Sequence, residues 1–262
     1  MNARVKLNID KKVGETTIDA AEIDKFSAMA ADWWDPFGKF RPLHKFNPVR
    51  LGYIRDAACA HFSRDAAAAT PLNGLRLLDI GCGGGLVAEP MARLGAAATA
   101  IDASEANIKT ALAHAGPLGL DIDYRCAAAE DMLAAGEGPY DIVLNLEVVE
   151  HVADVDLFLE TSSALVSPGG MLIMATINRT LKALALAKIG AEYILRWLPA
   201  GTHDPRKFVK PDDAKDALTR AGLTVIEDAG VSYNPLMDQW RISKDMDVNY
   251  MLTAVKPSAP TS

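Results

Sequence analysis

Short apolar runs alternate with amphipathic stretches through most of the chain after residue 70. The apolar runs predict buried strands over 75–80, 97–101, 122–126, 140–146, 171–176, 223–227 and 247–254. The stretches between them predict helices that end near Arg93 and that cover 105–114, 154–165 and 211–221. Strands that alternate with helices place the helices on both faces of a parallel sheet. We therefore expect an α/β fold, doubly wound around a mostly parallel, seven-stranded sheet.

The N-terminal part of the chain and one long connection depart from this alternation. Residues 1–20 are polar and predict a mobile tail, whereas residues 21–262 predict a single domain. Within it, residues 21–70 predict an N-terminal helical lid, because six of the 17 aromatic residues lie close together there. Asn47-Pro48 predicts the start of a helix in this lid. The connection over 177–210 is too long for a simple loop, so we expect a helical insertion after the fifth strand.

A glycine-rich loop, Gly81-Cys82-Gly83-Gly84-Gly85, follows the first predicted strand. Gly81 and Gly83 allow the backbone to turn tightly and to approach a ligand closely. The dinucleotide fingerprint requires glycine or alanine at position 86, where this chain has leucine, so NAD and FAD are disfavoured. Asp102 closes the second strand, where a carboxylate can accept hydrogen bonds from ribose hydroxyls. The alternative is that Asp102 only caps the helix that follows.

The glycine loop, Asp102 and the Ser167-Pro168-Gly169-Gly170 turn together resemble a class I S-adenosylmethionine methyltransferase. The resemblance implies a Rossmann-like fold and S-adenosyl-L-methionine as the cofactor. It also places Glu130, after the third strand, where such proteins hold the adenine. A solvated surface acid is the alternative for Glu130.

Segments outside the glycine loop resemble a narrower family, the ubiquinone biosynthesis O-methyltransferases, over about Phe26 to Ala254. These segments are Trp33-Trp34-Asp35, Pro42-Leu43-His44, 47–54, 190–196, 201–204, Lys207-Phe208 and 247–252. The resemblance implies methylation of a hydroxyl on polyprenylated catechol and demethylubiquinol intermediates. The alternative is an O-methyltransferase that acts on another small phenolic or lipophilic substrate.

The same resemblance assigns cofactor contacts to individual residues. It implies that Arg50 contacts the cofactor, and a guanidinium can pair with the methionyl carboxylate. It implies that Leu146, at the end of the fourth strand, lines the adenosyl site together with Gly81, Gly83 and Asp102. A surface arginine and ordinary core packing are the alternatives for Arg50 and Leu146.

Two carboxylates and an imidazole follow the fourth strand at the cofactor edge of the sheet. Glu147, Glu150 and His151 would share one face if this segment were helical. The resemblance implies that these three residues bind a metal and favours Mg²⁺, but imidazole is an unusual magnesium ligand, so another divalent cation stays open. Without a metal, His151 would be the general base, oriented by a carboxylate, and Glu147 is the second catalytic candidate. An acid-rich helix N-terminus is the third alternative.

The net charge of −7 disfavours a protein that binds nucleic acid through a broad basic surface. The insertion over 177–210 is an exception, because seven Lys or Arg and two acids give it a charge of +5. Its apolar residues at helical spacing suit either a buried core helix or an interfacial helix on an anionic membrane. The N-terminal residues show no secretory signal and the three cysteines no CxxC spacing. We therefore expect a cytoplasmic protein, in peripheral contact with the inner face of the membrane and associated with other ubiquinone-pathway enzymes.

Overall fold

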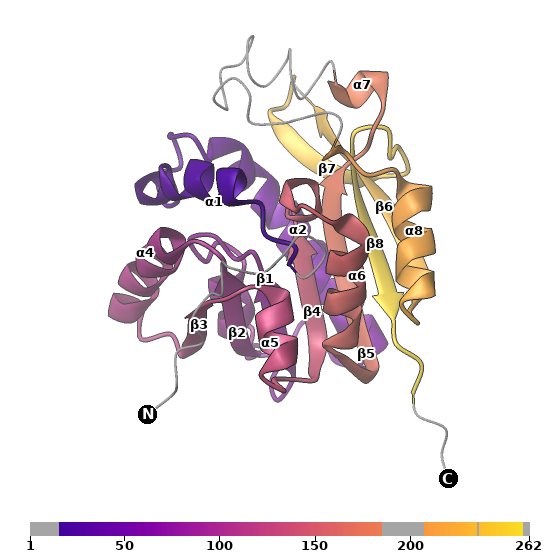
Figure 1. Cartoon of the computed structure of the whole chain (residues 1–262), viewed down its shortest axis with the longest axis horizontal. Helices are drawn as coiled ribbons and strands as arrows, with labels where there is room; N and C mark the ends of the chain where they lie inside the picture. Colours follow the sequence, from indigo (N-terminus) through magenta and orange to yellow (C-terminus); the bar gives the residue numbers. More distant parts are fainter. Residues whose placement is uncertain (1–15, 185–206, 235, 259–262) are drawn as a thin grey trace.

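The computed structural model of the chain describes residues 16–184, 207–234 and 236–258. Within these ranges eight strands form one sheet, in the order β3-β2-β1-β4-β5-β8-β6-β7 (Figure 1). The strands are β1 (Arg76–Ile80), β2 (Ala97–Asp102), β3 (Ile122–Cys126), β4 (Tyr140–Leu146), β5 (Val166–Ile177), β6 (Thr224–Asn234), β7 (Gln239–Ser243) and β8 (Asn249–Val255). Strands β1 to β5 pair in parallel, whereas β8, β6 and β7 run antiparallel to their neighbours. The predicted doubly wound α/β fold is confirmed.

Successive side chains of the central strands point to opposite faces of the sheet, and each face is covered by helices. Leu78 packs on one face with α5 (Ala129–Ala134), α6 (Val155–Ala164) and α8 (Pro211–Arg220). Leu77 packs on the other face with α2 (Arg41–His61) and α3 (Ala88–Arg93), and α4 (Glu105–Ala115) packs near β2 and β3. The strand order reverses between β1 and β4, so a ligand is expected at the carboxyl ends of these strands.

Several element boundaries differ from the sequence-based predictions. Helix α2 begins at Arg41 rather than at Asn47, because Pro42 lies in its first turn, where a missing N–H costs no hydrogen bond. Strand β5 includes residues 167–170, which were predicted as a turn, and its pairing with β4 is irregular there. Strand β7 was not predicted. Its side chains all stay exposed or half-buried at the edge of the sheet, so no apolar run marks it.

The N-terminal lid is docked on the glycine loop. Its two short helices are α1 and η1, which cover Ala20–Ser27 and Ala30–Asp32. The indole N–H of Trp33 donates to Asn107 Oδ1 at 2.9 Å. The Trp34 ring stacks on His114 with 3.4 Å between ring centroids, and its N–H donates to the Gly84 carbonyl at 2.9 Å. These contacts hold the lid against the carboxyl edge of the sheet.

Residues 16–19, predicted as part of the tail, are bound to the rest of the protein. The Thr17 carbonyl accepts a hydrogen bond from the Ala153 N–H at 2.9 Å, and Thr17 is buried. Asp19 caps α1 by accepting from the backbone N–H groups of Ala21 and Glu22. The predicted tail therefore extends too far by these residues, because their hydrogen bonds attach them to α5, to the turn before α6 and to the lid.

The structure describes only the two ends of the predicted insertion over 177–210. Helix α7 (Leu181–Leu184) follows β5, and Phe208 is buried at the other end. The stretch predicted as an amphipathic helix, around residues 186–197, lies outside the described residues. Among the helices that are described, none has the length and apolar composition needed to cross a membrane.

Candidate active site

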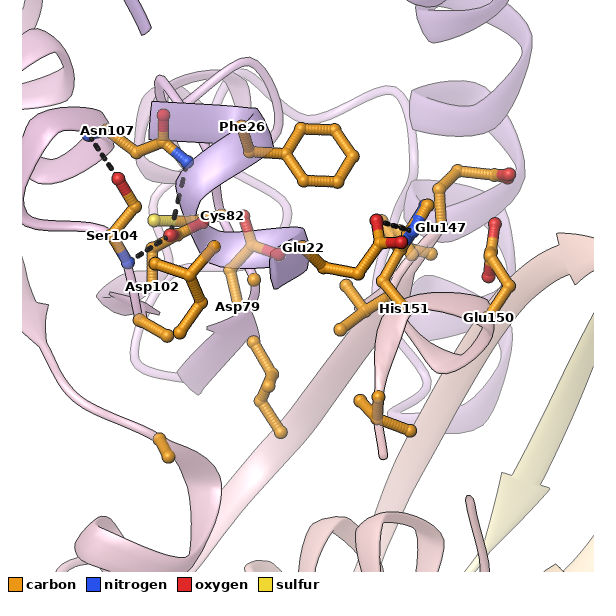
Figure 2. Close-up of a pocket in the computed structure, with 18 of the residues that line it drawn as sticks. Glu22, Phe26, Asp79, Cys82, Asp102, Ser104, Asn107, Glu147, Glu150 and His151 are labelled. Carbon is orange, nitrogen blue, oxygen red and sulfur yellow. Dashed lines mark hydrogen bonds and ion pairs between the residues drawn. The ribbon is translucent and has the colours of Figure 1, made fainter. Parts of the chain in front are cut away.

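A cavity of about 240 Å³ lies between the lid and the carboxyl ends of β1, β2 and β4 (Figure 2). The sheet contributes Asp79, Gly81 and Asp102, and the segment after β4 contributes Glu147 and its neighbours. The lid contributes mainly apolar side chains, which include Ile18, Ile23, Phe26, Phe40, Pro42 and Leu43. We call the polar groups at the strand ends, together with Arg50 of α2, the polar wall, and we call the apolar side chains of the lid the apolar wall.

Asp102 ends β2 with its carboxylate held by the adjacent turns. It accepts hydrogen bonds from the Gly83 N–H at 2.9 Å, the Ser104 N–H at 2.8 Å and the Asn107 amide at 3.2 Å (Figure 2). Burial raises the pKa of Asp102, and these hydrogen bonds oppose that shift. The N-cap of α4 is Ser104, so capping this helix is not the role of Asp102.

The glycines of the loop are also required by their protein neighbours. A Cβ on Gly83, whose φ is +55°, would lie 2.3 Å from Trp33 Cζ2. A Cβ on Gly81, whose φ is +69°, would lie 2.4 Å from Val148 Cγ2. Gly81 lines the cavity as predicted, whereas Gly83 lies behind it, where it donates to Asp102 and makes room for the lid.

Replacing Gly83 with alanine is expected to lower the melting temperature and to weaken cofactor binding together. The left-handed backbone costs a side chain about 1–2 kcal/mol, and the new methyl group also displaces Trp33 and with it the lid. Gly119→Ala is the matched control, because Gly119 has a φ of +65° and no atom within 4 Å of the added Cβ. Thermal unfolding and titration with S-adenosylhomocysteine measure the two effects. Equal losses in both variants would contradict the contact with Trp33 as the cause.

A buried cation lies between two carboxyls at the polar wall. Arg50 comes from α2, and its Nε and Nη2 donate to Asn47 Oδ1 at 3.2 and 2.7 Å. Burial lowers the pKa of Arg50, and the charges of Glu147 and Asp79 oppose this shift. Burial raises the pKa of Asp79 to about 7 against the effect of Arg50. Asp79 Oδ2 has no hydrogen-bond partner among the described residues, so this wall can bind both ends of a zwitterion.

Glu147 and Glu150 form a second acidic group, but not on the predicted helix face. Glu147 has a φ of +57°, and Val149–His151 is a single 3-10 turn. Glu150 Oε2 accepts a hydrogen bond from Thr176 Oγ1 at 2.7 Å. Burial and the neighbouring Glu147 raise the pKa of Glu150 to about 8, and burial also raises the pKa of Glu147. Within the described residues, Oε1 of each carboxyl lacks a hydrogen-bond partner.

His151 faces the lid. Its Nδ1 lies 3.0 Å from Glu22 Oε2, and the Phe26 ring meets the imidazole edge-on at 4.9 Å between centroids (Figure 2). Burial lowers the pKa of His151 and Glu22 opposes this shift, while the hydrogen bond to His151 lowers the pKa of Glu22 to about 2. A neutral imidazole that donates from Nδ1 keeps Nε2 free to accept a proton. The carboxylate that is hydrogen-bonded to His151, the predicted base, is therefore that of Glu22 and not that of Glu147.

Two of these residues, Asp79 and Glu22, were not predicted from the sequence. Asp79 lies in an apolar run directly before the glycine loop, and a carboxyl in such a run was a signal, since buried acids are rare unless paired. Glu22 is 129 positions from His151 in the chain. No local pattern links two residues at that separation, so only the tertiary structure could pair them.

The predicted three-ligand metal site is not assembled. Within the residues that the structure describes, no group of three or more His, Cys, Asp or Glu is arranged to hold a metal ion. His151 Nδ1 is hydrogen-bonded to Glu22, so this nitrogen is not free to act as a ligand in the predicted metal site. Glu147 and Glu150 still fit a hard cation, because each has an unpartnered buried oxygen and Mg²⁺ commonly binds through one or two carboxylates.

The resemblance assigned Leu146 and Glu130 to the adenosyl end of the site, but only one of them lines the cavity. Leu146 lines the cavity, as expected. Glu130 lies on α5 outside the cavity lining, where it accepts hydrogen bonds from Thr16 Oγ1 and the Thr17 N–H, both at 2.7 Å. Residues 127–129 line the cavity instead, and the Ala127 N–H donates to the Asp102 carbonyl. All three are alanines, and this hydrogen bond places Ala127 beside Asp102.

Comparison with known proteins agrees with this geometry. A family model described as a methyltransferase domain matches residues 51–228. The chain is 61% identical over 244 residues to the ubiquinone biosynthesis O-methyltransferase of Chelativorans sp. (strain BNC1), which covers 93% of this chain and 96% of that protein. It is 60% identical over 247 residues to the protein of the same name from Brucella anthropi, at 94% and 99% coverage.

Solved structures show the same fold at low identity. The N-methyltransferase NodS from Bradyrhizobium japonicum WM9, in complex with S-adenosyl-L-homocysteine, matches with a TM-score of 0.60 and 15% identity, over 90% of this chain and 99% of that one. The magnesium protoporphyrin IX methyltransferase from Synechocystis PCC 6803 matches with a TM-score of 0.55 and 21% identity, over 88% and 99%. By its sequence, its fold and its relatives, the chain belongs to the ubiquinone biosynthesis O-methyltransferase family of S-adenosylmethionine-dependent enzymes.

Proposed function

We propose that this enzyme transfers the methyl group of S-adenosyl-L-methionine to a hydroxyl of polyprenylated catechol and demethylubiquinol intermediates. The observation that carries the proposal is the position of His151, which lines the same cavity as Asp102 and Arg50. A proton acceptor therefore lies in reach of the predicted cofactor site. The names of the relatives at about 60% identity support the substrate class, and the apolar wall of the lid suits a hydrophobic aromatic ring.

The polar wall suits the separate parts of the cofactor. Asp102 would accept from the ribose hydroxyls, and residues 127–129, which also line the cavity, would pack against the adenine. Arg50 would pair with the methionyl carboxylate, and Asp79 Oδ2, which has no hydrogen-bond partner among the described residues, would accept from the ammonium group. Burial disfavours the ionised form of Asp79 in the free protein, and a bound ammonium group would favour it.

His151 accepts the proton of the substrate hydroxyl through Nε2. A phenolic hydroxyl has a pKa of about 10, so little phenolate is present at neutral pH without a base. When bound, S-adenosyl-L-methionine would supply the methyl group to the phenolate oxygen, and its sulfur would keep the electron pair of the carbon–sulfur bond. The products are the methyl ether and S-adenosylhomocysteine. Holding oxygen, carbon and sulfur in line is the main task of the cavity walls.

Short-chain catechol and demethylubiquinol analogues test the proposal, with labelled S-adenosyl-L-methionine and mass spectrometry of the products. Methylation of both analogues is the expected result. Methylation of an unrelated phenol alone would favour the alternative, an O-methyltransferase for another small phenolic or lipophilic substrate. Absence of transfer to every phenol would contradict the proposed chemistry.

We also propose that Glu147 and Glu150 bind Mg²⁺ or another divalent cation. When bound, such a cation supplies positive charge that favours the ionised form of a nearby hydroxyl. The support is the pair of buried carboxyl oxygens that have no hydrogen-bond partner among the described residues. Burial raises the pKa values of both carboxyls, and Glu147 further raises that of Glu150, so binding of a cation would release protons.

Mg²⁺ is expected to raise the melting temperature of the wild-type protein and not that of Glu150→Gln. Binding to the folded state alone stabilises it, and neutralising one carboxyl removes the site. Glu160→Gln is the matched control, because Glu160 is an exposed acid on α6. Thermal unfolding against Mg²⁺ concentration gives the answer without an activity assay. An equal Mg²⁺ response in wild type and Glu150→Gln would contradict this site.

For the insertion over 177–210 we propose peripheral contact with an anionic membrane. Its charge of +5 and its apolar residues support this, and a polyprenyl substrate partitions into lipid. Sedimentation with vesicles that contain or lack anionic lipid tests the contact. Negligible binding to both would contradict it. Association with other ubiquinone-pathway enzymes stays a prediction.

A further inference from the structure

The lid helix α1 supplies a carboxylate to the predicted base. Glu22 Oε2 lies 3.0 Å from His151 Nδ1 and 3.1 Å from Lys25 Nζ. The side chains of His151 and Glu22 are only 14% and 18% exposed, so protein rather than bulk water surrounds the pair. Phe26, on the same helix, packs edge-on against the imidazole. Helix α1 therefore holds His151 by one polar and one aromatic contact.

We propose that Glu22 is a positioning residue for His151, and that the catalytic base is complete only while α1 is docked. This inference rests on the proposed function, because it assigns an orienting group to the base for the phenolic hydroxyl. A carboxylate at Nδ1 holds the proton on that nitrogen and leaves Nε2 as the acceptor. It also stabilises the imidazolium that forms when the substrate proton arrives.

A cation from a distant part of the chain holds α1 in this position. Lys207 Nζ donates to Asp19 Oδ2 at 2.7 Å and lies 3.6 Å from Glu22 Oε1. Asp19 is the N-cap of α1, so this contact fixes the first turn of the helix, which also carries Glu22. Lys207 lies near the C-terminal end of the insertion. The position of Glu22 therefore depends on the segment that we propose contacts the membrane.

The other end of α1 contacts the predicted ribose site. Ser27 Oγ lies 2.6 Å from Ser104 Oγ, and the Ser104 N–H donates to Asp102. Helix α1 therefore contacts Ser104, which donates to Asp102, and also contacts His151, the proposed base. Docking of α1 over a bound cofactor would orient His151 at the same time. Deprotonation of the substrate is then restricted to the closed site that already holds the methyl donor.

Glu22→Gln tests this role, because the amide has nearly the same size but can donate to Nδ1 and so stabilise the wrong imidazole tautomer. We expect kcat to fall by about 10²-fold or more, since a positioned base is worth about 10²–10⁴-fold. The dissociation constant for S-adenosylhomocysteine should stay within about twofold of wild type. Asp24→Asn makes the same acid-to-amide change at an exposed position of α1 and should leave both quantities unchanged.

The proposal is overturned if Glu22→Gln keeps wild-type kcat, or if cofactor binding weakens as much as kcat falls, which would indicate a purely structural role. Nitrogen NMR of ¹⁵N-histidine provides a readout that needs no substrate, with the His151 signals assigned from His151→Gln. Wild type should show the proton on Nδ1, and Glu22→Gln should shift it toward Nε2. If wild type methylates no phenol while this tautomer shift is present, the proposed function fails and the positioning role stands.

Discussion

Replacing His151 with glutamine is expected to lower kcat by about 10²–10⁴-fold while S-adenosylhomocysteine binds within about twofold of wild type. Glutamine has no basic nitrogen, so the substrate hydroxyl keeps its proton, and the methyl donor meets a neutral phenol in place of a phenolate. The proposed cofactor contacts lie on other residues, such as Asp102 and Arg50. Steady-state kinetics and calorimetric titration separate the two effects.

His61→Gln is the control for this variant, because His61 lies at the end of α2 and bonds to the Gly169 carbonyl outside the cavity lining. It should leave kcat unchanged. Burial lowers the pKa of His151 below its usual 6.5, so the base is neutral through the physiological range. Wild-type kcat should therefore rise with pH only below about 6.5. Near-normal turnover of His151→Gln at neutral pH would rule out the base.

Replacing Arg50 with alanine is expected to weaken binding of S-adenosylhomocysteine by at least about 30-fold, because truncating one partner of a buried charge pair costs about 2–5 kcal/mol. The methionyl carboxylate loses its guanidinium partner. Asp79 and Glu147 also lose the cation that keeps their pKa values down. Both carboxyls then take up protons more readily, and a protonated Asp79 no longer attracts the ammonium group.

The same variant should lose more stability at pH 8 than at pH 5.5. Asp79 already has a folded pKa of about 7, above its usual 3.8, so its ionisation opposes folding as the pH rises through this range. Removing Arg50 raises the folded pKa further and enlarges the penalty at high pH. Arg55→Ala is the control, because Arg55 is a partly exposed residue of α2 that pairs with the adjacent Asp56. A pH-independent loss of stability in Arg50→Ala would contradict this account.

The central strands β1, β2 and β4 were predictable because they are buried on both faces. Strands β1 to β4 begin and end within one residue of the predicted apolar runs. Prediction failed where tertiary contacts replace a local signal. Asn47 has the sequence of a helix cap, but it lies inside α2, where its amide donates to the Leu86 carbonyl and its oxygen accepts from Arg50. Strand β7 exists because β6 offers it an edge, not because its own residues are apolar.

The sequence alone determined the fold class, the cofactor class and the membership of Asp102, Arg50 and His151 in one site. Parallel strands bring their carboxyl ends to one edge, which places Asp102 and His151 together, whereas the cofactor class and the place of Arg50 followed from the resemblance of the motifs to a known family. Only the tertiary structure decided which acidic residue is hydrogen-bonded to His151. Glu22 lies on a lid helix with no sequence link to His151, and the left-handed Glu147 breaks the helix that would have aligned the three predicted ligands. Such pairings depend on how the lid and the turn after β4 pack together, and local patterns do not record that packing.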